Sequence, residues 1–305
     1  MLNMVGIKFR KWWKKNYGCY MFLIPAFIGF FTFSMYPLVY SLFLSFTNYN
    51  GSRFTKFGLF NYQQIFSDGL INGWATISNS FALTFKFTLI AVPVGMVLSF
   101  GLALLLHKPV AGIKGFRIIY YLPCLIPGIA MSIIYADMFD FPDGIINQIL
   151  GIFGMQPLTF FTDKSTVMVS YIVAGFFGLG GNMIMWLAAL ENVPPQLIEA
   201  AKIDGAGSLR VLFRIIIPMC TPIIFYTLIN SVISTLQIFD SYASIGVGPE
   251  ESMYFIVILV YRIGFTQYQM GFACAIAWML FIIIAILTLL LFKTQNWVFY
   301  ADEEN

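Results

Sequence analysis

Charged side chains are scarce in this sequence, at 10% of its 305 residues, against roughly 25% in ordinary soluble domains. Histidine occurs once and cysteine four times, and no two cysteines have the C-x-x-C spacing typical of a zinc or redox site. The glycine-rich phosphate loop G-x-x-x-x-G-K-[ST] is missing as well. These absences argue against a disulfide framework and a zinc site, and they exclude ATP hydrolysis by this chain itself.

Long apolar runs are what the sequence has instead. Hydrophobic residues make up 59% of the chain and the mean hydropathy is +0.82. Because about 20 apolar residues cross a bilayer as a helix, the runs predict an all-α, polytopic membrane protein. Six transmembrane helices are expected, at about 19–46, 78–106, 116–139, 167–190, 211–239 and 268–292.

The lysines and arginines predict the orientation of these spans. With the N-terminus inside, twelve of the 17 basic residues lie on the inner side and four on the outer side. This positive-inside bias places both termini in the cytoplasm. The remaining one, Lys86, falls inside the second span, where it either snorkels toward the outer interface or takes part in substrate passage.

A polar stretch separates the fourth and fifth spans, and the orientation places it in the cytoplasm. Pro194 and Pro195 stop the fourth span, since proline suits only the first turn of a helix. A short helix is expected over 196–203, and Gly205 can take the left-handed conformation that ends it. From these residues alone, the loop at about 194–210 is either a plain helical hairpin or a docking element for another protein.

A spacing pattern in this loop resembles a known motif. Glu199-Ala200-Ala201 is followed by three residues, Gly205, nine residues, Ile215, one residue and Ile217-Pro218. This is similar to the EAA loop of binding-protein-dependent ABC importers, with isoleucine at 217 in place of leucine. "FGLFNYQQIF", "RIIYYLPCLIP", "GIINQIL" and "LVYRIGFTQYQMGFACAIAWMLFIII" resemble segments of one branch, the MalF-like permease subunits of carbohydrate-uptake importers.

The resemblance implies a type I importer fold, a single permease domain over 1–305 with core spans at about 78–292, in the bacterial inner membrane. It implies that the loop is the coupling helix, which docks on a cytoplasmic ATPase through Glu199, Ala200, Ala201, Asp204 and Gly205. It also implies the partners: a homologous second permease subunit, two ATPase subunits that use ATP and magnesium, and an extracytoplasmic solute-binding protein. The substrate would be a carbohydrate or another polyol such as a glycerol phosphate. Neither a cofactor bound by this chain nor a nucleic-acid partner is expected.

Polar residues inside the spans suggest a substrate path, because such groups are costly in a bilayer. In the fifth span, Asn230, Ser234, Gln237 and Ser241 are spaced as one helical stripe. Amides, hydroxyls and an indole suit a sugar, which binds through hydroxyl hydrogen bonds and aromatic stacking. The other expectation is hydrogen bonding between packed helices. The full set of candidates is Asn182, Trp186, Asn230, Ser231, Ser234, Thr235 and Gln237.

Two other functional classes remain as alternatives. Asp137, Asp140 and Asp143 form a D-x2-D-x2-D pattern that could hold magnesium in a membrane enzyme, or form a solvated outer loop facing the binding protein. A secondary transporter commonly has an inverted repeat and intramembrane charges. The sequence shows no obvious repeat and only one charge, Lys86, that is clearly within a span.

Overall fold

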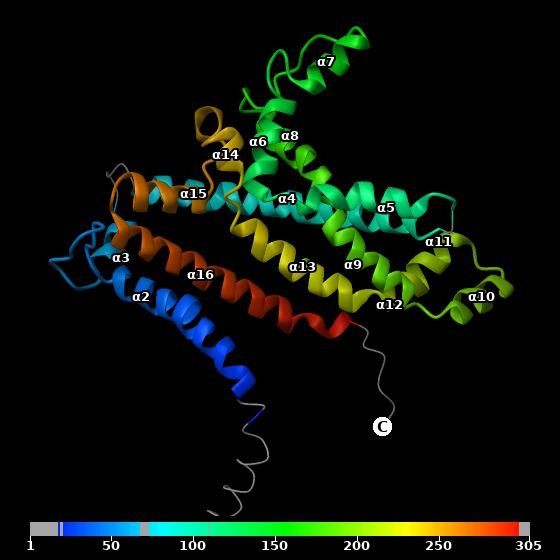
Figure 1. The fold of residues 1–305 in the computed structure, drawn as a ribbon, viewed down its shortest axis with the longest axis horizontal. Helices are drawn as coiled ribbons and strands as arrows, with labels where there is room; N and C mark the ends of the chain where they lie inside the picture. Colours follow the sequence, from blue (N-terminus) through cyan, green and yellow to red (C-terminus); the bar gives the residue numbers. More distant parts are fainter. Residues whose placement is uncertain (1–17, 19–20, 68–72, 109, 299–305) are drawn as a thin grey trace, which may run out of the picture. The chain divides into compact units, whose positions relative to one another are not determined.

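The computed structural model describes residues 18, 21–67, 73–108 and 110–298 (Figure 1). Both termini, predicted to lie in the cytoplasm, fall outside the described residues. The chain forms two compact units. Unit 1 comprises residues 1–66 and 263–278, and unit 2 comprises residues 67–262 and 279–305.

The described elements are helical. Unit 1 holds η1 (Phe30–Met35), α2 (Tyr36–Ser45), α3 (Phe60–Ile65) and the first part of α16 (Met270–Lys293). The elements of unit 2 up to residue 203 are α4 (Trp74–His107), α5 (Ile113–Tyr121), η2 (Leu122–Leu125), α6 (Gly128–Met138), α7 (Ile145–Ile152), α8 (Val167–Ala174), η3 (Gly175–Gly178), α9 (Gly180–Glu191) and α10 (Pro195–Ile203). Those that follow are α11 (Ser208–Val211), η4 (Leu212–Ile216), α12 (Ile217–Met219), α13 (Thr221–Leu236), α14 (Ser241–Ile245), η5 (Pro249–Glu251), α15 (Ile256–Tyr261), η6 (Arg262–Thr266, at the boundary of the units) and η7 (Gln295–Trp297).

Within unit 1, the loop after α2 is fixed by side-chain and backbone contacts. The buried amide of Asn61 donates hydrogen bonds of 2.8 Å to the carbonyls of Ser45 and Thr47. Gly271, at the start of α16, lies so close to the backbone of Thr47 that a Cβ would collide with it. Its N–H donates to the carbonyl of Tyr49 at 2.9 Å. The end of α2 and the start of α16 are therefore held together.

Within unit 2, α4 is the element on which others assemble. Its 34 residues make a helix about 51 Å long, longer than the roughly 30 Å hydrocarbon core of a bilayer. Both α9 and α13 pack against it (Figure 1). The buried side chains between α4 and α9 include Ala103, Leu106 and Leu187, and they form one apolar cluster, called here the α4–α9 core.

The predicted third and fourth spans are not straight helices. The third is broken by a bend of 103° between Leu125 and Gly128, and the fourth by a bend of 53° around Leu179. The first bend follows from Pro127, whose ψ of 138° is extended and which has no N–H to continue a helix. By length and composition, four described helical segments can cross a membrane, or up to six if each bent pair is one span.

The loop between α7 and α8 is tied by its own side chains. The amide of Asn147 donates to the carbonyls of Asp140 and Leu158, at 2.9 and 3.1 Å, and its oxygen accepts from the N–H of Leu158. Hydrogen bonds from the hydroxyl and backbone N–H of Ser165 lower the pKa of Asp163. The Asp163 carboxylate therefore stays ionised and holds the turn that leads into α8.

The helix α15 was not predicted, because the sequence pattern assigned its residues to the loop before the sixth span. Ile256, Ile258 and Leu259 are completely buried in the structure. The N–H of Ile256 donates to the hydroxyl of Thr84 on α4 at 3.0 Å, which satisfies a group at the open start of the helix.

Candidate coupling and translocation sites

The short helix α10 forms where the sequence predicts one. Pro195 is its first residue, and Pro194 before it is extended. At the other end, the N–H of Ala206 donates to the carbonyl of Ala201 at 2.9 Å, and the N–H of Gly205 to that of Lys202 at 3.0 Å. These two bonds are the Schellman motif, which needs a left-handed residue at the position of Gly205. The φ of Gly205 is +77°, as expected.

The free face of α10 mixes carboxylates, small residues and apolar side chains. Glu199, Ala200 and Asp204 are exposed, while Ala201 is partly covered. Ile203 is 86% exposed, although it is a large hydrophobic residue. In Figure 1, α10 lies at the edge of unit 2, past the ends of α9 and α12. This face therefore offers charged, small and apolar groups to another protein, without forming a large apolar patch.

The opposite face of α10 is anchored to the α4–α9 core. Ile198 of α10 packs against this cluster, and so do Ile215 of η4 and two residues of α13, Ile223 and Ile224. Val193, just before α10, is itself a buried member. A force applied to α10 therefore reaches α13 through one set of close-packed side chains.

Arg117 adds a polar tie next to this core. Its guanidinium donates two hydrogen bonds to the carbonyl of Leu106 near the end of α4, and lies 3.7 Å from the Glu191 carboxylate at the end of α9. The sequence predicted only that Arg117 is a basic residue on the inner side. Its partners lie elsewhere in the chain, and a single sequence carries no signal that pairs them.

The predicted polar stripe lies along one face of α13. Asn230, Ser234 and Gln237 are exposed. The amide of Asn230 donates to the carbonyl of Tyr226 one turn earlier, at 2.9 Å, and the Ser234 hydroxyl donates to the carbonyl of Ser231 at 3.1 Å. Asn230 and Ser234 thus each have a partner within α13 and keep further capacity for hydrogen bonds toward the open side. Gln237 caps the end of the helix.

The other members of the predicted path lie elsewhere. Ser231 and Thr235 are partly covered beside the stripe, and Asn182 is half-buried on α9. Trp186 is only 2% exposed, and its indole N–H donates to the Ser99 hydroxyl at 3.1 Å inside the α4–α9 core. Its ring therefore fills the core in this structure and offers no face on which a sugar could stack.

The expected continuation of the stripe to Ser241 was wrong. Because α13 ends at Leu236, residue 241 belongs to α14 and does not follow the helical spacing. Ser241 is completely buried, unlike Ser234 and Gln237. The stripe therefore ends at Gln237.

The aspartate trio does not form a metal site. Asp137 lies in α6, while Asp140 and Asp143 lie in the loop that follows, and all three are exposed. Among the residues that the structure describes, no three His, Cys, Asp or Glu side chains gather closely enough to hold a metal ion. The structure therefore gives no support for the alternative of a magnesium-dependent enzyme built on this trio.

Comparison with known proteins identifies the family of this chain. Residues 92–298 match the family of inner membrane components of binding-protein-dependent transport systems. The chain belongs to this family. It is a membrane permease subunit and not an enzyme, and it resides in the inner membrane.

Relatives match over nearly the whole chain. The lactose transport system permease protein LacF of Rhizobium radiobacter is 32% identical over 282 residues, which cover 90% of this chain and 92% of the relative. The multiple sugar-binding transport system permease protein MsmF of Streptococcus mutans is 30% identical over 94% of this chain and 98% of its own length. A chain from the crystal structure of a bacterial ABC transporter for the acidic polysaccharide alginate has the same fold, with a TM-score of 0.83 at 20% identity and coverage of 96% and 100%.

Proposed function

We propose that this chain is the permease subunit of an ABC importer that carries a sugar or oligosaccharide across the inner membrane. The observation that carries this proposal is the near full-length similarity to relatives named for lactose and for multiple sugars. A relative from Halalkalibacterium halodurans, 30% identical over 88% of this chain, is named for arabinooligosaccharides. These names share one chemical class, the sugars, which are rich in hydroxyl groups.

The polar face of α13 suits such a solute. Asn230, Ser234 and Gln237 offer amides and a hydroxyl without a charge, so they can exchange hydrogen bonds with sugar hydroxyls. The opposite face of α13, with Leu228, Val232 and Leu236, lines an apolar groove against α4. The helix therefore packs through one face and leaves the polar one open for the path.

The subunit does not supply the energy. Two separate ATPase subunits use ATP and magnesium, and one of them docks on α10 in the cytoplasm. An extracytoplasmic binding protein delivers the solute. A second, homologous permease subunit completes the path. The supporting features are the exposed face of α10 and the family, whose transport systems depend on a binding protein.

The proposed mechanism passes motion through the α4–α9 core. When the ATPases move α10, Ile198 presses on the core, and Ile223 and Ile224 on α13 move with it. Close-packed side chains are hardly compressible, so they pass the displacement on to α13. The polar face of α13 then opens first toward one side of the membrane and next toward the other.

Transport by cells lacking the gene tests the proposal. The strain is offered radiolabelled lactose, arabinooligosaccharides and other sugars one at a time, with glycerol phosphate as the comparison solute. We expect uptake of at least one sugar to be lost and to return when the gene is restored. Unchanged uptake of every sugar, together with loss of glycerol phosphate uptake, would contradict the proposed substrate class.

A further inference from the structure

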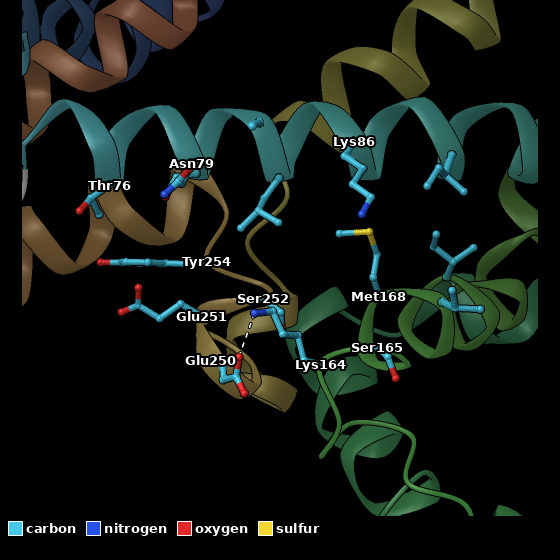
Figure 2. Close-up of a pocket in the computed structure, with 16 residues that line it drawn as sticks. Thr76, Asn79, Lys86, Lys164, Ser165, Met168, Glu250, Glu251, Ser252 and Tyr254 are labelled. Atoms are coloured by element: carbon cyan, nitrogen blue, oxygen red, sulfur yellow. Dashed lines mark hydrogen bonds and ion pairs between the residues drawn. The ribbon is translucent and has the colours of Figure 1, made fainter.

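Lys86 lies beside a cavity that the proposed translocation path does not use. The cavity has a volume of about 580 Å³ and lies between α4, the start of α8 and the segment that leads into α15. In Figure 2, the Lys86 side chain extends from α4 toward Met168 of α8. The polar face of α13 contributes nothing to this cavity.

Two lysines line the cavity, and Lys86 is the one that forms no ion pair with any described carboxylate. Lys164 is bound to Glu250 at 2.8 Å. Glu251 lies next to Tyr254, away from Lys86 (Figure 2). The ion pairs found in the described part of the chain do not include Lys86. An anion entering on the Lys86 side thus meets an uncompensated ammonium group.

The depth of Lys86 matches a lipid headgroup. From Lys86 to His107, α4 rises about 31 Å, which equals the roughly 30 Å thickness of a hydrocarbon core. With the orientation proposed above and His107 at the inner interface, Lys86 lies at the outer one, so the part of α4 inside the hydrocarbon core starts about eight residues later than the predicted span start at 78. The basic residue therefore stands where the phosphates of outer-leaflet lipids lie.

The surface below Lys86 is apolar and open. Leu89 is 77% exposed and Val97 is 70% exposed on the same side of α4, and Val169 of α8 is 61% exposed. Leu89 also lines an apolar groove of about 370 Å³ between α4, α13 and the end of α16. The groove is separate from the cavity that Lys86 lines, and the exposed apolar surface on the Lys86 side of α4 is the part that matters here. A cation beside such a surface is complementary to a phospholipid, with an anionic head and two acyl chains.

We propose that Lys86 and the apolar surface beneath it form a binding site for an anionic phospholipid of the outer leaflet. The ammonium group binds the lipid phosphate, and the acyl chains lie along α4 from Leu89 toward Val97. One lysine near a bilayer surface changes lipid affinity by about fivefold. The site shares no residue with the proposed sugar path, so it does not depend on the path being assigned correctly.

Photocrosslinking in vesicles tests this site on the full chain, purified with its co-expressed partners. The vesicles are phosphatidylcholine with a photoactivatable phosphatidylglycerol, or with a phosphatidylcholine that carries the same acyl-chain probe. We expect phosphatidylglycerol to label the α4 peptide that contains Leu89 and Val97 about fivefold more than phosphatidylcholine does. In Lys86→Gln the two lipids should label equally, and Lys86→Arg should keep the preference.

Control variants and a competitor make the outcome decisive. Lys56→Gln removes an exposed lysine that does not line the cavity and should leave the labelling unchanged. Equal labelling by both lipids in the native protein, or a preference that survives Lys86→Gln, overturns the proposal. Displacement of the lipid by millimolar glycerol phosphate also overturns it, because the site would then serve a soluble anion. Loss of sugar uptake in Lys86→Gln with unchanged lipid labelling would assign Lys86 to the translocation path instead.

Discussion

The guanidinium of Arg117 donates hydrogen bonds of 3.0 and 3.3 Å to the backbone carbonyl of Leu106. Leu106 is in the last turn of α4, where carbonyls have no partner within the helix. The same side chain reaches Glu191 at the end of α9. One arginine therefore ties together α5, α4 and α9 directly beside the segment that leads to α10.

Replacing Arg117 tests this tie. Arg117→Gln should destabilise the subunit by about 1–2 kcal/mol, since a hydrogen bond from a charged group is worth roughly 1.5–3 kcal/mol and this one is partly exposed. The thermal unfolding midpoint of the purified complex measures the change. Arg210→Gln, at an exposed position in the same region, serves as the control and should have no effect. An unchanged midpoint for Arg117→Gln would contradict the structural role.

Substitution of Gly205 should disturb coupling through the backbone alone. At a φ of +77°, an alanine costs about 1–2 kcal/mol, whereas asparagine costs less because it tolerates the left-handed region. Uptake should therefore be highest with the native glycine at position 205, lower with asparagine and lowest with alanine. Gly207 is the matched control, because its φ of −70° suits any residue and an added Cβ would meet nothing within 4 Å. If Gly207→Ala reduces uptake as much as Gly205→Ala, the capping explanation is wrong.

The polar face of α13 should control uptake without controlling ATP hydrolysis. Gln237→Ala should weaken sugar binding by about 0.5–1.5 kcal/mol, the value of one hydrogen bond. Ser234→Leu should do more, because it also fills the path. Stimulation of the ATPases by the binding protein should persist in both variants, and both activities are measured in reconstituted vesicles. Normal uptake in the two variants would indicate that the stripe only packs against other helices.

The membrane orientation has a direct chemical test. On a background without the native cysteines, a cysteine at Gln196 should be protected from an impermeant maleimide in intact cells and react once the cells are opened. A cysteine at Asn50 should react in intact cells. The reverse pattern would place α10 outside and would contradict its contact with a cytoplasmic ATPase.

Local sequence signals predicted α10 and its end because each depends on neighbouring residues. Pro195 starts the helix and Gly205 ends it through steric preferences that need no tertiary contact. Apolar length also located the four described helical segments that can cross a membrane and the two bent pairs, although the sequence alone did not give the 103° bend at Pro127. Membrane helices often contain proline without such a bend, so its size depends on the packing around it.

Features that depend on distant residues could not be predicted. Trp186 was a candidate for stacking against sugar, but a tryptophan on a helical face has the same pattern whether it lines a path or fills a core. In the structure Trp186 is buried and bonded to Ser99, a contact that joins two helices far apart in the sequence. Ser241 was misplaced because the end of α13 at Leu236 has no glycine or proline to mark it.

The central claim is that α10 converts ATP hydrolysis by a partner into sugar movement through this subunit. Its most direct test is the number of sugar molecules imported per ATP hydrolysed in vesicles that contain the full complex and its binding protein. Glu199→Ala, which alters the exposed face of α10 and leaves its packed face intact, should lower this ratio severalfold while the complex stays assembled. An unchanged ratio in Glu199→Ala and in Gly205→Ala, or sugar uptake that needs no ATP, would contradict the account.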